Sequence, residues 1–240
     1  MTMSAETAID VRRAAQRFHT RLDWLDSWHS FSFGEHHDPA NTAHGLLLVS
    51  NDDTVAPAAG FGPHSHRDME IVTWVLEGEL EHRDSAGNHD VIRPGLAQRM
   101  SAGRGITHSE ANASRDEPVH FVQMWVLPDA RGIEPGYEQR DVSAALSVPE
   151  LVAVASGRGH DGAVGLHQRD AVLWAARLGA GDAVTIPEAH HVHLFVARGE
   201  ANLERAGELS TGDAVRLTDA GALTLVAGPS GAETLVWETG

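Results

Sequence analysis

Apolar and β-branched runs alternate along the chain with clusters of turn-forming residues. In the first half, residues 71–76 (IVTWVL) and 120–127 (HFVQMWVL) are typical of buried strands. In the second half we expect strands at residues 192–197, 203–209, 214–217 and 223–226, each bounded by glycine, aspartate or proline. Many short strands with frequent turns predict an all-β protein built as a sandwich or as barrels.

Turn and helix signals favour the same class. Asp-Ser-Ala-Gly-Asn at residues 84–88 predicts a hairpin turn, and Arg-Pro-Gly at residues 93–95 predicts another. The only helices that the sequence favours are short, one around residues 147–151 and one within part of the amino-terminal segment. The amino-terminal segment also contains the aromatic residues Trp24, Trp28, Phe31 and Phe33. They either form a strand over a barrel mouth or pack in the core, and we favour packing.

An internal repeat indicates two similar barrels rather than one large sandwich. Gly78 lies within Val-Leu-Glu-Gly-Glu-Leu-Glu, and Gly95 follows it seventeen residues later. Gly199 lies within Val-Ala-Arg-Gly-Glu-Ala-Asn, and Gly212 follows it thirteen residues later. In both copies a strand ends at glycine, a hairpin follows, and a Pro-Gly or Thr-Gly turn leads into the next strand.

The boundary between the two barrels is expected where proline and glycine interrupt the strands, between residues 128 and 152. We therefore divide the chain into a first domain, residues 1–140, and a second domain, residues 141–240.

Length and composition narrow the functional classes. At 240 residues, with 42% hydrophobic and 22% charged residues, the chain can bury the cores of two small globular domains. It has no cysteine, which excludes disulfides, thiolate ligands and a cysteine nucleophile. The net charge of −16 and the scattered arginines argue against binding to nucleic acid. The sequence has neither a secretory signal nor a membrane-length apolar run, so we expect a cytoplasmic protein with no membrane partner.

The 16 histidines are dispersed along the chain, so their number alone does not indicate a metal site and their spacing must be considered. His64 and His66 precede the 71–76 strand, and in an extended chain two such alternate side chains face the same way. His108 and Glu110 repeat this spacing behind a glycine turn. One such pair is more often solvated or internally satisfied than bound to metal. Two pairs of matching parity, on strands expected to be neighbours, favour a single metal site.

The surrounding motifs resemble those of the cupins. Gly-Pro-His-Ser-His-Arg-Asp-Met-Glu, which ends at Glu70, resembles the first cupin motif, and the segment from Pro94 to Glu110 resembles the second. The wording D-S-W-H-S-F-S-F and M-S-A-G-R-G-I-T-H-S-E is similar to the pirin family, and more narrowly to its bacterial quercetin 2,3-dioxygenase branch. This resemblance is close over the first 140 residues and looser beyond residue 150. It implies two tandem cupin barrels, each a double-stranded β-helix or jelly roll.

The carboxylate ligand has two candidates. Many cupins use the first motif, where Glu70 stands, whereas pirin-like proteins use the second motif, here Glu110. Both side chains would lie on the histidine face of a regular strand, so parity leaves the choice open. The resemblance implies that the metal ligands are His64, His66, His108 and Glu110.

Mixed imidazole and carboxylate ligation suits Fe, Mn, Co, Ni, Cu or Zn, and four protein ligands leave room for an oxygen donor and dioxygen. The resemblance favours one Fe(II) ion. Gln123, a polar residue in the 120–127 strand, is a candidate to hydrogen-bond one of the ligand histidines.

The second dense group of histidines is His-His-Val-His at residues 190–193. When Gly199 is aligned with Gly78, the positions that correspond to the four ligands hold side chains that do not bind metal: Thr185, Pro187, Leu225 and Ala227. A second metal at His191 and His193 is an alternative, because the two share a strand face. We favour a metal-free second barrel that serves packing.

The resemblance implies an enzyme, a metal-dependent dioxygenase that cleaves a small hydroxylated aromatic substrate, a flavonol such as quercetin, with dioxygen and release of carbon monoxide. Glu110 is then also the expected base for the substrate hydroxyl. The alternative is a metal-binding, redox-sensing regulatory protein that acts through protein partners. An isomerase or hydrolase is a third candidate, because the cupin fold does not fix function.

Overall fold

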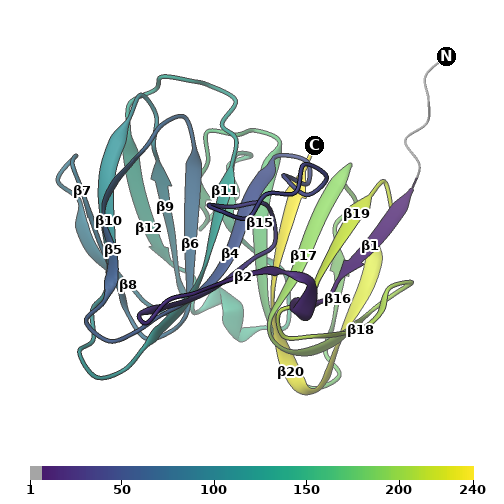
Figure 1. The fold of residues 1–240 in the computed structure, drawn as a ribbon. Coiled ribbons are helices and arrows are strands. Elements are labelled where there is room, and N and C mark those ends of the chain that lie inside the picture. Colours follow the sequence, from purple (N-terminus) through teal and green to yellow (C-terminus); the bar gives the residue numbers. More distant parts are fainter. Residues whose placement is uncertain (1–6) are drawn as a thin grey trace.

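Strands dominate residues 7–240, the part of the chain that this computed structural model describes (Figure 1). Its two helical segments are single 3₁₀ turns, η1 (Ala14–Gln16) and η2 (Ala145–Ser147). The predicted helix at residues 147–151 is therefore shorter and earlier than expected. The first six residues of the amino-terminal segment lie outside the described range. No helix among residues 7–240 has the length and apolar character needed to span a membrane.

The first barrel consists of two facing sheets. The larger sheet has seven strands in the order β12 (Gly136–Asp141), β9 (Leu96–Ser101), β6 (Glu70–Glu77), β11 (Val119–Val126), β4 (Leu47–Val55), β3 (Leu25–His29) and β2 (Phe18–Arg21). The smaller sheet has the order β5 (Gly60–His66), β10 (Ile106–Asn112), β7 (Leu80–Asp84) and β8 (His89–Ile92). Leu80 and Ile92 of the smaller sheet pack against Val75 and Phe121 of the larger one in a core that excludes water.

The second barrel forms from one continuous sheet that bends around its own core. Its strands run in the order β1 (Ala8–Arg12), β19 (Ala214–Thr218), β17 (His191–Leu203), β20 (Leu223–Thr239), β15 (Ala171–Leu178), β13 (Val152–Ser156) and β14 (Val164–Gly165). Two more strands pair off this path, β16 (Ala183–Ile186) with β20 and β18 (Gly207–Ser210) with β17. Register shifts in the β17–β20 pair, between Val196 and Arg198 and between Gly199 and Ala201, mark irregularities at which such long strands bend.

The expectation of two tandem cupin barrels is confirmed, and the repeat has a physical basis in its glycines. Gly78 and Gly199 both have a φ of 77°, and Gly95 and Gly212 have φ values of 91° and 86°. A Cβ atom at Gly78 would meet Pro118 O at 2.6 Å. Only glycine adopts this left-handed conformation without strain while another strand passes so close.

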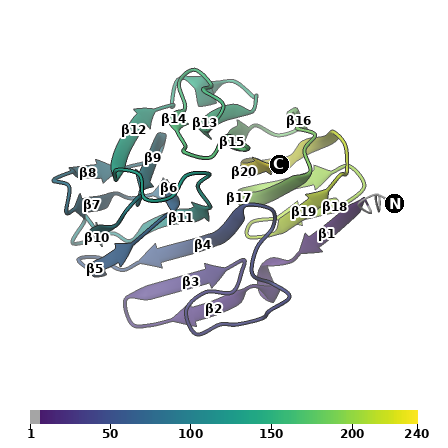
Figure 2. The same ribbon diagram turned by 90° about the horizontal axis from the view of Figure 1, so that it is seen from above.

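The two barrels share a buried interface between the larger first sheet and the second barrel (Figures 1 and 2). Trp74 Nε1 donates to Glu233 Oε1 at 2.9 Å, and the buried Trp237 lies against Met124. The amino terminus crosses this interface, because β1 pairs with β19 of the second barrel while β2 and β3 extend the first (Figure 2). The division of the domains at residue 140 stays a prediction. Strand β1 lies within the predicted first domain but pairs with a strand of the second barrel.

Candidate metal centre

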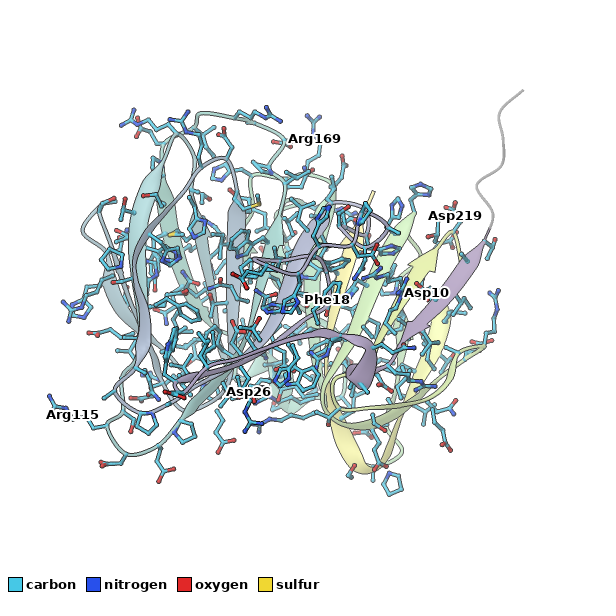
Figure 3. The ribbon with its side chains drawn as sticks, viewed as in Figure 1. Asp10, Phe18, Asp26, Arg115, Arg169 and Asp219 are labelled. Atoms are coloured by element: carbon cyan, nitrogen blue, oxygen red, sulfur yellow. The ribbon has the colours of Figure 1, made fainter. Side chains whose placement is uncertain are left out.

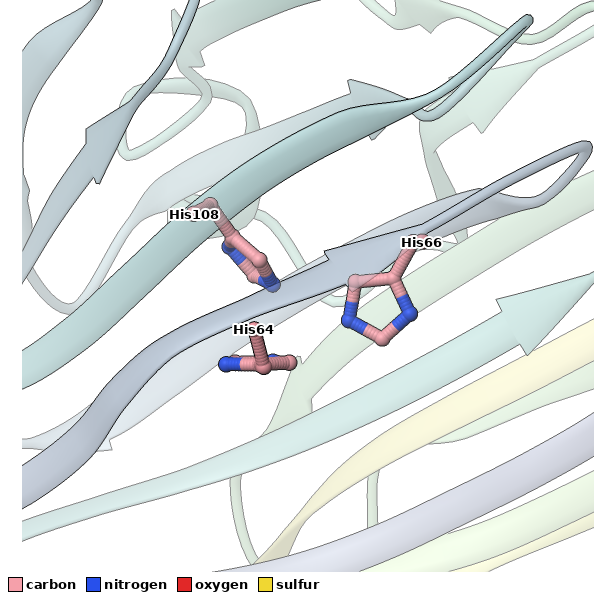
Figure 4. A group of neighbouring side chains, drawn as sticks. All are labelled: His64, His66 and His108. Carbon is pink, nitrogen blue, oxygen red and sulfur yellow. The ribbon is translucent and has the colours of Figure 1, made fainter.

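Three histidines meet on the inner face of the smaller sheet (Figure 4). Strands β5 and β10 are antiparallel neighbours, and His108 pairs directly with His64. The ring centroids of His64, His66 and His108 are 4.4 to 5.0 Å apart, and one ring nitrogen of each lies within 4.8 Å of the others. The alternation of side chains along a strand therefore brings the predicted trio together.

The state of these imidazoles fits metal binding. His64 Nδ1 hydrogen-bonds the Gly62 carbonyl at 2.9 Å, and a donating Nδ1–H leaves Nε2 free to ligate. His66 Nε2 and both ring nitrogens of His108 are buried without a hydrogen-bond partner. Burial, with the charge of the neighbouring imidazoles, lowers the pKa of His66 to about 4 and that of His108 to about 3. The lowered pKa values of His66 and His108 and the free Nε2 of His64 thus fit a divalent ion, which binds neutral imidazole nitrogen.

Glu110 lies two residues beyond His108 on the inner face of β10, where the strand alternates buried and half-buried positions. Its carboxylate belongs to a second cluster of possible ligands, with His108 and His82, whose ligand atoms also lie within 4.8 Å of one another. Gln123 Nε2 donates to both carboxylate oxygens, at 3.0 and 2.7 Å. Burial raises the pKa of Glu110. Gln123 thus faces the site as expected, but it holds the carboxylate rather than a histidine.

Glu70, the competing carboxylate, points elsewhere. Strand β5 ends at His66 and β6, which begins at Glu70, belongs to the opposite sheet, so the two residues do not share a strand face. Glu70 Oε2 accepts hydrogen bonds from Ser101 Oγ at 2.9 Å and from the backbone N–H of His167 at 3.1 Å. Glu70 therefore ties the first barrel to a loop of the second.

His82 is a residue of the site that the sequence reasoning missed. It is fully buried in β7, its ring centroid lies 5.3 Å from that of His108, and its Nε2 hydrogen-bonds Asp84 Oδ2 at 3.1 Å. The available signal was the alternation of Leu80, His82 and Asp84, which indicates one inward face.

A cavity of about 670 Å³ opens next to this centre. Glu110 and Gln123 form part of its wall, together with His66 and Trp125, whose ring centroids are 4.8 Å apart. Trp125 Nε1 also donates to Gln123 Oε1 at 3.2 Å. Apolar and aromatic walls with a few converging polar groups are typical of a site for a small organic molecule.

The amino-terminal hairpin β2–β3 closes the other side of this cavity. Figure 3 labels Phe18 and Asp26, which lie at opposite ends of the hairpin. Leu25 and His29 of β3 and the following Phe33 line the cavity. The expected packing role holds for Phe31, which is buried, but Phe33 contributes to the cavity wall instead.

Asp53 is the second residue of the cavity that the sequence reasoning missed. It is buried in β4, and Ser27 Oγ donates to its Oδ1. Burial raises its pKa to about 7, with the nearby negative charge of Asp52 adding to the effect. A carboxyl group in this state exchanges its proton near neutral pH.

The histidines of the second barrel are dispersed by comparison. His190 Nδ1 hydrogen-bonds Asp219 Oδ1 at 2.8 Å on the rim of that barrel, where Figure 3 labels Asp219. His191 lies edge-on to His44, with ring centroids 5.0 Å apart, and His193 is buried near Phe31. Within residues 7–240, the groups of three or more possible ligands are the two in the first barrel.

Comparison with known proteins agrees with this architecture. Residues 9–126 match the family model described as Pirin, and residues 153–238 match the model of the quercetinase C-terminal cupin domain. A Mycobacterium tuberculosis protein, named provisionally as a quercetin 2,3-dioxygenase, is 60% identical over 96% of this chain and 94% of its own length. The chain belongs to the pirin family.

Two comparisons with Escherichia coli proteins show how similar this chain is to bacterial pirins. A protein named quercetin 2,3-dioxygenase is 38% identical over 96% of this chain and 98% of its own length. The crystal structure of the bacterial pirin YhhW in complex with nickel(II) has 37% identity and a TM-score of 0.89, and covers 97% of this chain and 99% of that chain. Pirin relatives thus share both the fold and nearly the full length of this chain.

Proposed function

We propose that this pirin is a metal-dependent dioxygenase that opens the ring of a flavonol such as quercetin. The observation that carries the proposal is the position of three imidazoles and a buried carboxylate beside a cavity of about 670 Å³ with aromatic walls. That volume lies within the usual range for small-molecule sites. The names of the Escherichia coli and Mycobacterium tuberculosis relatives support the same activity.

The proposed ligands are His64, His66, His108 and Glu110. When bound, a divalent ion supplies a positive charge that stabilises a deprotonated substrate hydroxyl, together with redox capacity toward dioxygen. We propose Fe(II) for this chain, and the same donors also suit nickel, the ion in the YhhW complex.

Within this chain, Glu110 is the proposed base. Burial raises the pKa of its carboxyl group, so its oxygen accepts the proton of a substrate hydroxyl more readily than an exposed glutamate does. Gln123 fixes that oxygen by donating to both carboxylate atoms. Trp125 and Phe33 are edge-on to each other, with ring centroids 5.5 Å apart, and offer apolar surface for an aromatic substrate while excluding water.

The activity is tested with protein loaded separately with Fe, Mn, Co, Ni or Cu and incubated with quercetin in air and without oxygen. We expect loss of the flavonol absorbance only when both a metal and oxygen are present, with carbon monoxide released. If no metal supports oxygen-dependent loss, the dioxygenase proposal is wrong and the regulatory alternative moves ahead.

The ligand assignment is tested with two matched substitutions, Glu110→Gln and Glu70→Gln. We expect Glu110→Gln to lose bound metal and activity, because the amide is a weaker ligand and no base. Glu70→Gln should keep one metal per chain, since its side chain bonds Ser101 and His167 instead. The reverse result would show that Glu70 is the ligand.

A further inference from the structure

A small cavity, partly open to solvent, lies between the amino-terminal segment and the second barrel, apart from the histidine centre. Its volume is about 20 Å³, enough for one particle the size of a water molecule or a monoatomic ion. Arg17 and Ser30 line it from the first half of the chain, and His193 of β17 and Arg216 of β19 line it from the second.

These four side chains share an unusual feature. Arg17 Nε, Ser30 Oγ, Arg216 Nε and both ring nitrogens of His193 are buried without a hydrogen-bond partner. A buried polar group without a partner costs folding free energy, so several around one cavity indicate a ligand that satisfies them together. Because a guanidinium N–H only donates, that ligand must accept hydrogen bonds.

The charge around the cavity points to an anion. Arg12 pairs with Asp10 at 2.7 Å, and Arg17 pairs with Asp52 at 3.0 Å. Arg216 Nη2 instead donates to two neutral oxygens, those of the Ser30 backbone at 2.9 Å and the Asn41 side chain at 2.6 Å.

Arg216 is 7% exposed, and among residues 7–240 no carboxylate lies within ion-pair distance of it. Its guanidinium carbon lies 4.4 Å from the Phe31 ring centroid, a contact that offsets part of the charge but offers no acceptor to Nε. Burial and Arg12 lower the pKa of Arg216 to about 10, so the group is still protonated at neutral pH. A buried positive charge without an ion pair, which Asp10 on the facing strand β1 offsets only in part, thus adjoins the unpartnered donors.

We propose that this cavity binds one chloride ion, which joins the two barrels through Arg17 and Ser30 on one side and His193 and Arg216 on the other. An anion accepts from every donor around it, whereas water must also donate. Oxyanions such as sulfate are too large for a cavity of about 20 Å³. This inference is independent of the activity proposed for the histidine centre.

The first test measures thermal unfolding of the metal-loaded full chain at constant ionic strength, with sodium chloride replacing sodium gluconate. An ion that binds only the folded state raises the melting temperature by mass action, by about 5–10 °C at a concentration 100 times Kd. We expect a saturating rise with chloride and bromide but none with sulfate. Equal responses to chloride and gluconate would refute the site.

The second test locates the ion. Crystals grown with bromide in place of chloride should show an anomalous scattering peak in the cavity between Arg17 and Arg216. A peak elsewhere with only water in the cavity would overturn the proposal, because water then satisfies the donors.

Substitutions test separately how the charge of Arg216 and the hydrogen bond from Ser30 contribute to chloride binding. Arg216→Met should abolish the chloride dependence of the melting temperature, whereas Ser30→Ala, which keeps the charge and removes one donor, should weaken it about tenfold. Ser30→Ala also keeps the test decisive if Arg216→Met does not fold. Arg205→Gln is the control, because Arg205 is an exposed arginine of the same barrel that donates to the Ala220 carbonyl. An unchanged chloride response in Ser30→Ala and Arg216→Met would contradict the proposed ligands.

Discussion

The two barrels use equivalent strand pairs for opposite purposes. In the first, β5 and β10 direct His64, His66, His108 and Glu110 toward the centre and the adjoining cavity. In the second, β16 pairs with the beginning of β20, and the buried residues of β16 and of residues 223–227 are all apolar: Val184, Ile186, Leu223, Leu225 and Ala227. The interior of the first barrel thus holds the candidate metal ligands, whereas the corresponding part of the second barrel holds only apolar side chains.

This difference indicates that the second barrel contributes mainly to stability, whereas the first barrel carries the candidate functional site. A buried leucine or isoleucine stabilises the second barrel by about 1.5–3 kcal/mol. The buried imidazole nitrogens without a partner at His66 and His108 cost the first barrel free energy, which the proposed metal ion would restore. His193 of the second barrel shares this feature, but it lies beside Phe31 and not in the apolar core between β16 and β20.

The largest effect is expected from removing a histidine at the centre. His108→Gln should weaken metal binding more than about 100-fold, since even changes in the groups that orient ligands cost about 10–100-fold. His193→Gln is the matched change of a buried histidine in the second barrel, and it should keep one metal per chain. Metal analysis after dialysis compares the metal content of the two variants. Loss of metal in His193→Gln would contradict the proposal that only the first barrel binds metal.

The second barrel should instead respond through stability. Leu225 is fully buried at a position that the glycine alignment pairs with His108. Leu225→Ala should lower the free energy of unfolding by about 2–5 kcal/mol, because it leaves a cavity in a packed core. Urea unfolding measures this loss, and metal stoichiometry in the same variant should stay unchanged. A loss below about 1 kcal/mol would mean that this interior is loosely packed.

Much of this contrast was predictable from local sequence. The alternation of side chains along a strand predicted that His64 faces the same way as His66, and His108 the same way as Glu110. The repeated glycines predicted two barrels. Both signals depend on residues that are close together in the sequence. The predicted strand at residues 203–209 is correct only at its ends, because Leu203 belongs to β17 and residues 207–209 belong to β18. Residues 204–206 form a turn between β17 and β18, where Arg205 adopts a φ of 66°.

The remaining errors concern contacts between distant segments. Glu70 could not be separated from Glu110 by parity, because the assignment of β5 and β6 to opposite sheets is a tertiary fact. The same holds for the partner of Gln123 and for β1, which pairs with β19 about 200 residues away. No local pattern encodes such pairings.

Gln123 offers a way to sharpen the role of the carboxylate. Gln123→Ala removes both hydrogen bonds to Glu110, so we expect metal affinity to fall about 10–100-fold with the fold intact. Gln98→Ala is a matched control, because Gln98 is a buried glutamine on β9 of the same sheet and its Oε1 has no hydrogen-bond partner. Isothermal titration with Ni(II) measures both variants. Equal affinities would show that Gln123 does not position the carboxylate.

The smallest effect concerns the interface histidines and follows from pH. His44 Nε2 hydrogen-bonds the Leu217 carbonyl at 3.0 Å, and burial lowers its pKa from 6.5 to about 4. The folded state therefore binds this proton less readily than the unfolded state, and the stability from His44 is complete above pH 6.5 and declines as pH falls toward 4. Between pH 7 and pH 5, the melting temperature of the wild type should fall roughly 2–4 °C more than that of His44→Gln. Parallel decreases in both proteins would show that protonation of His44 does not oppose folding.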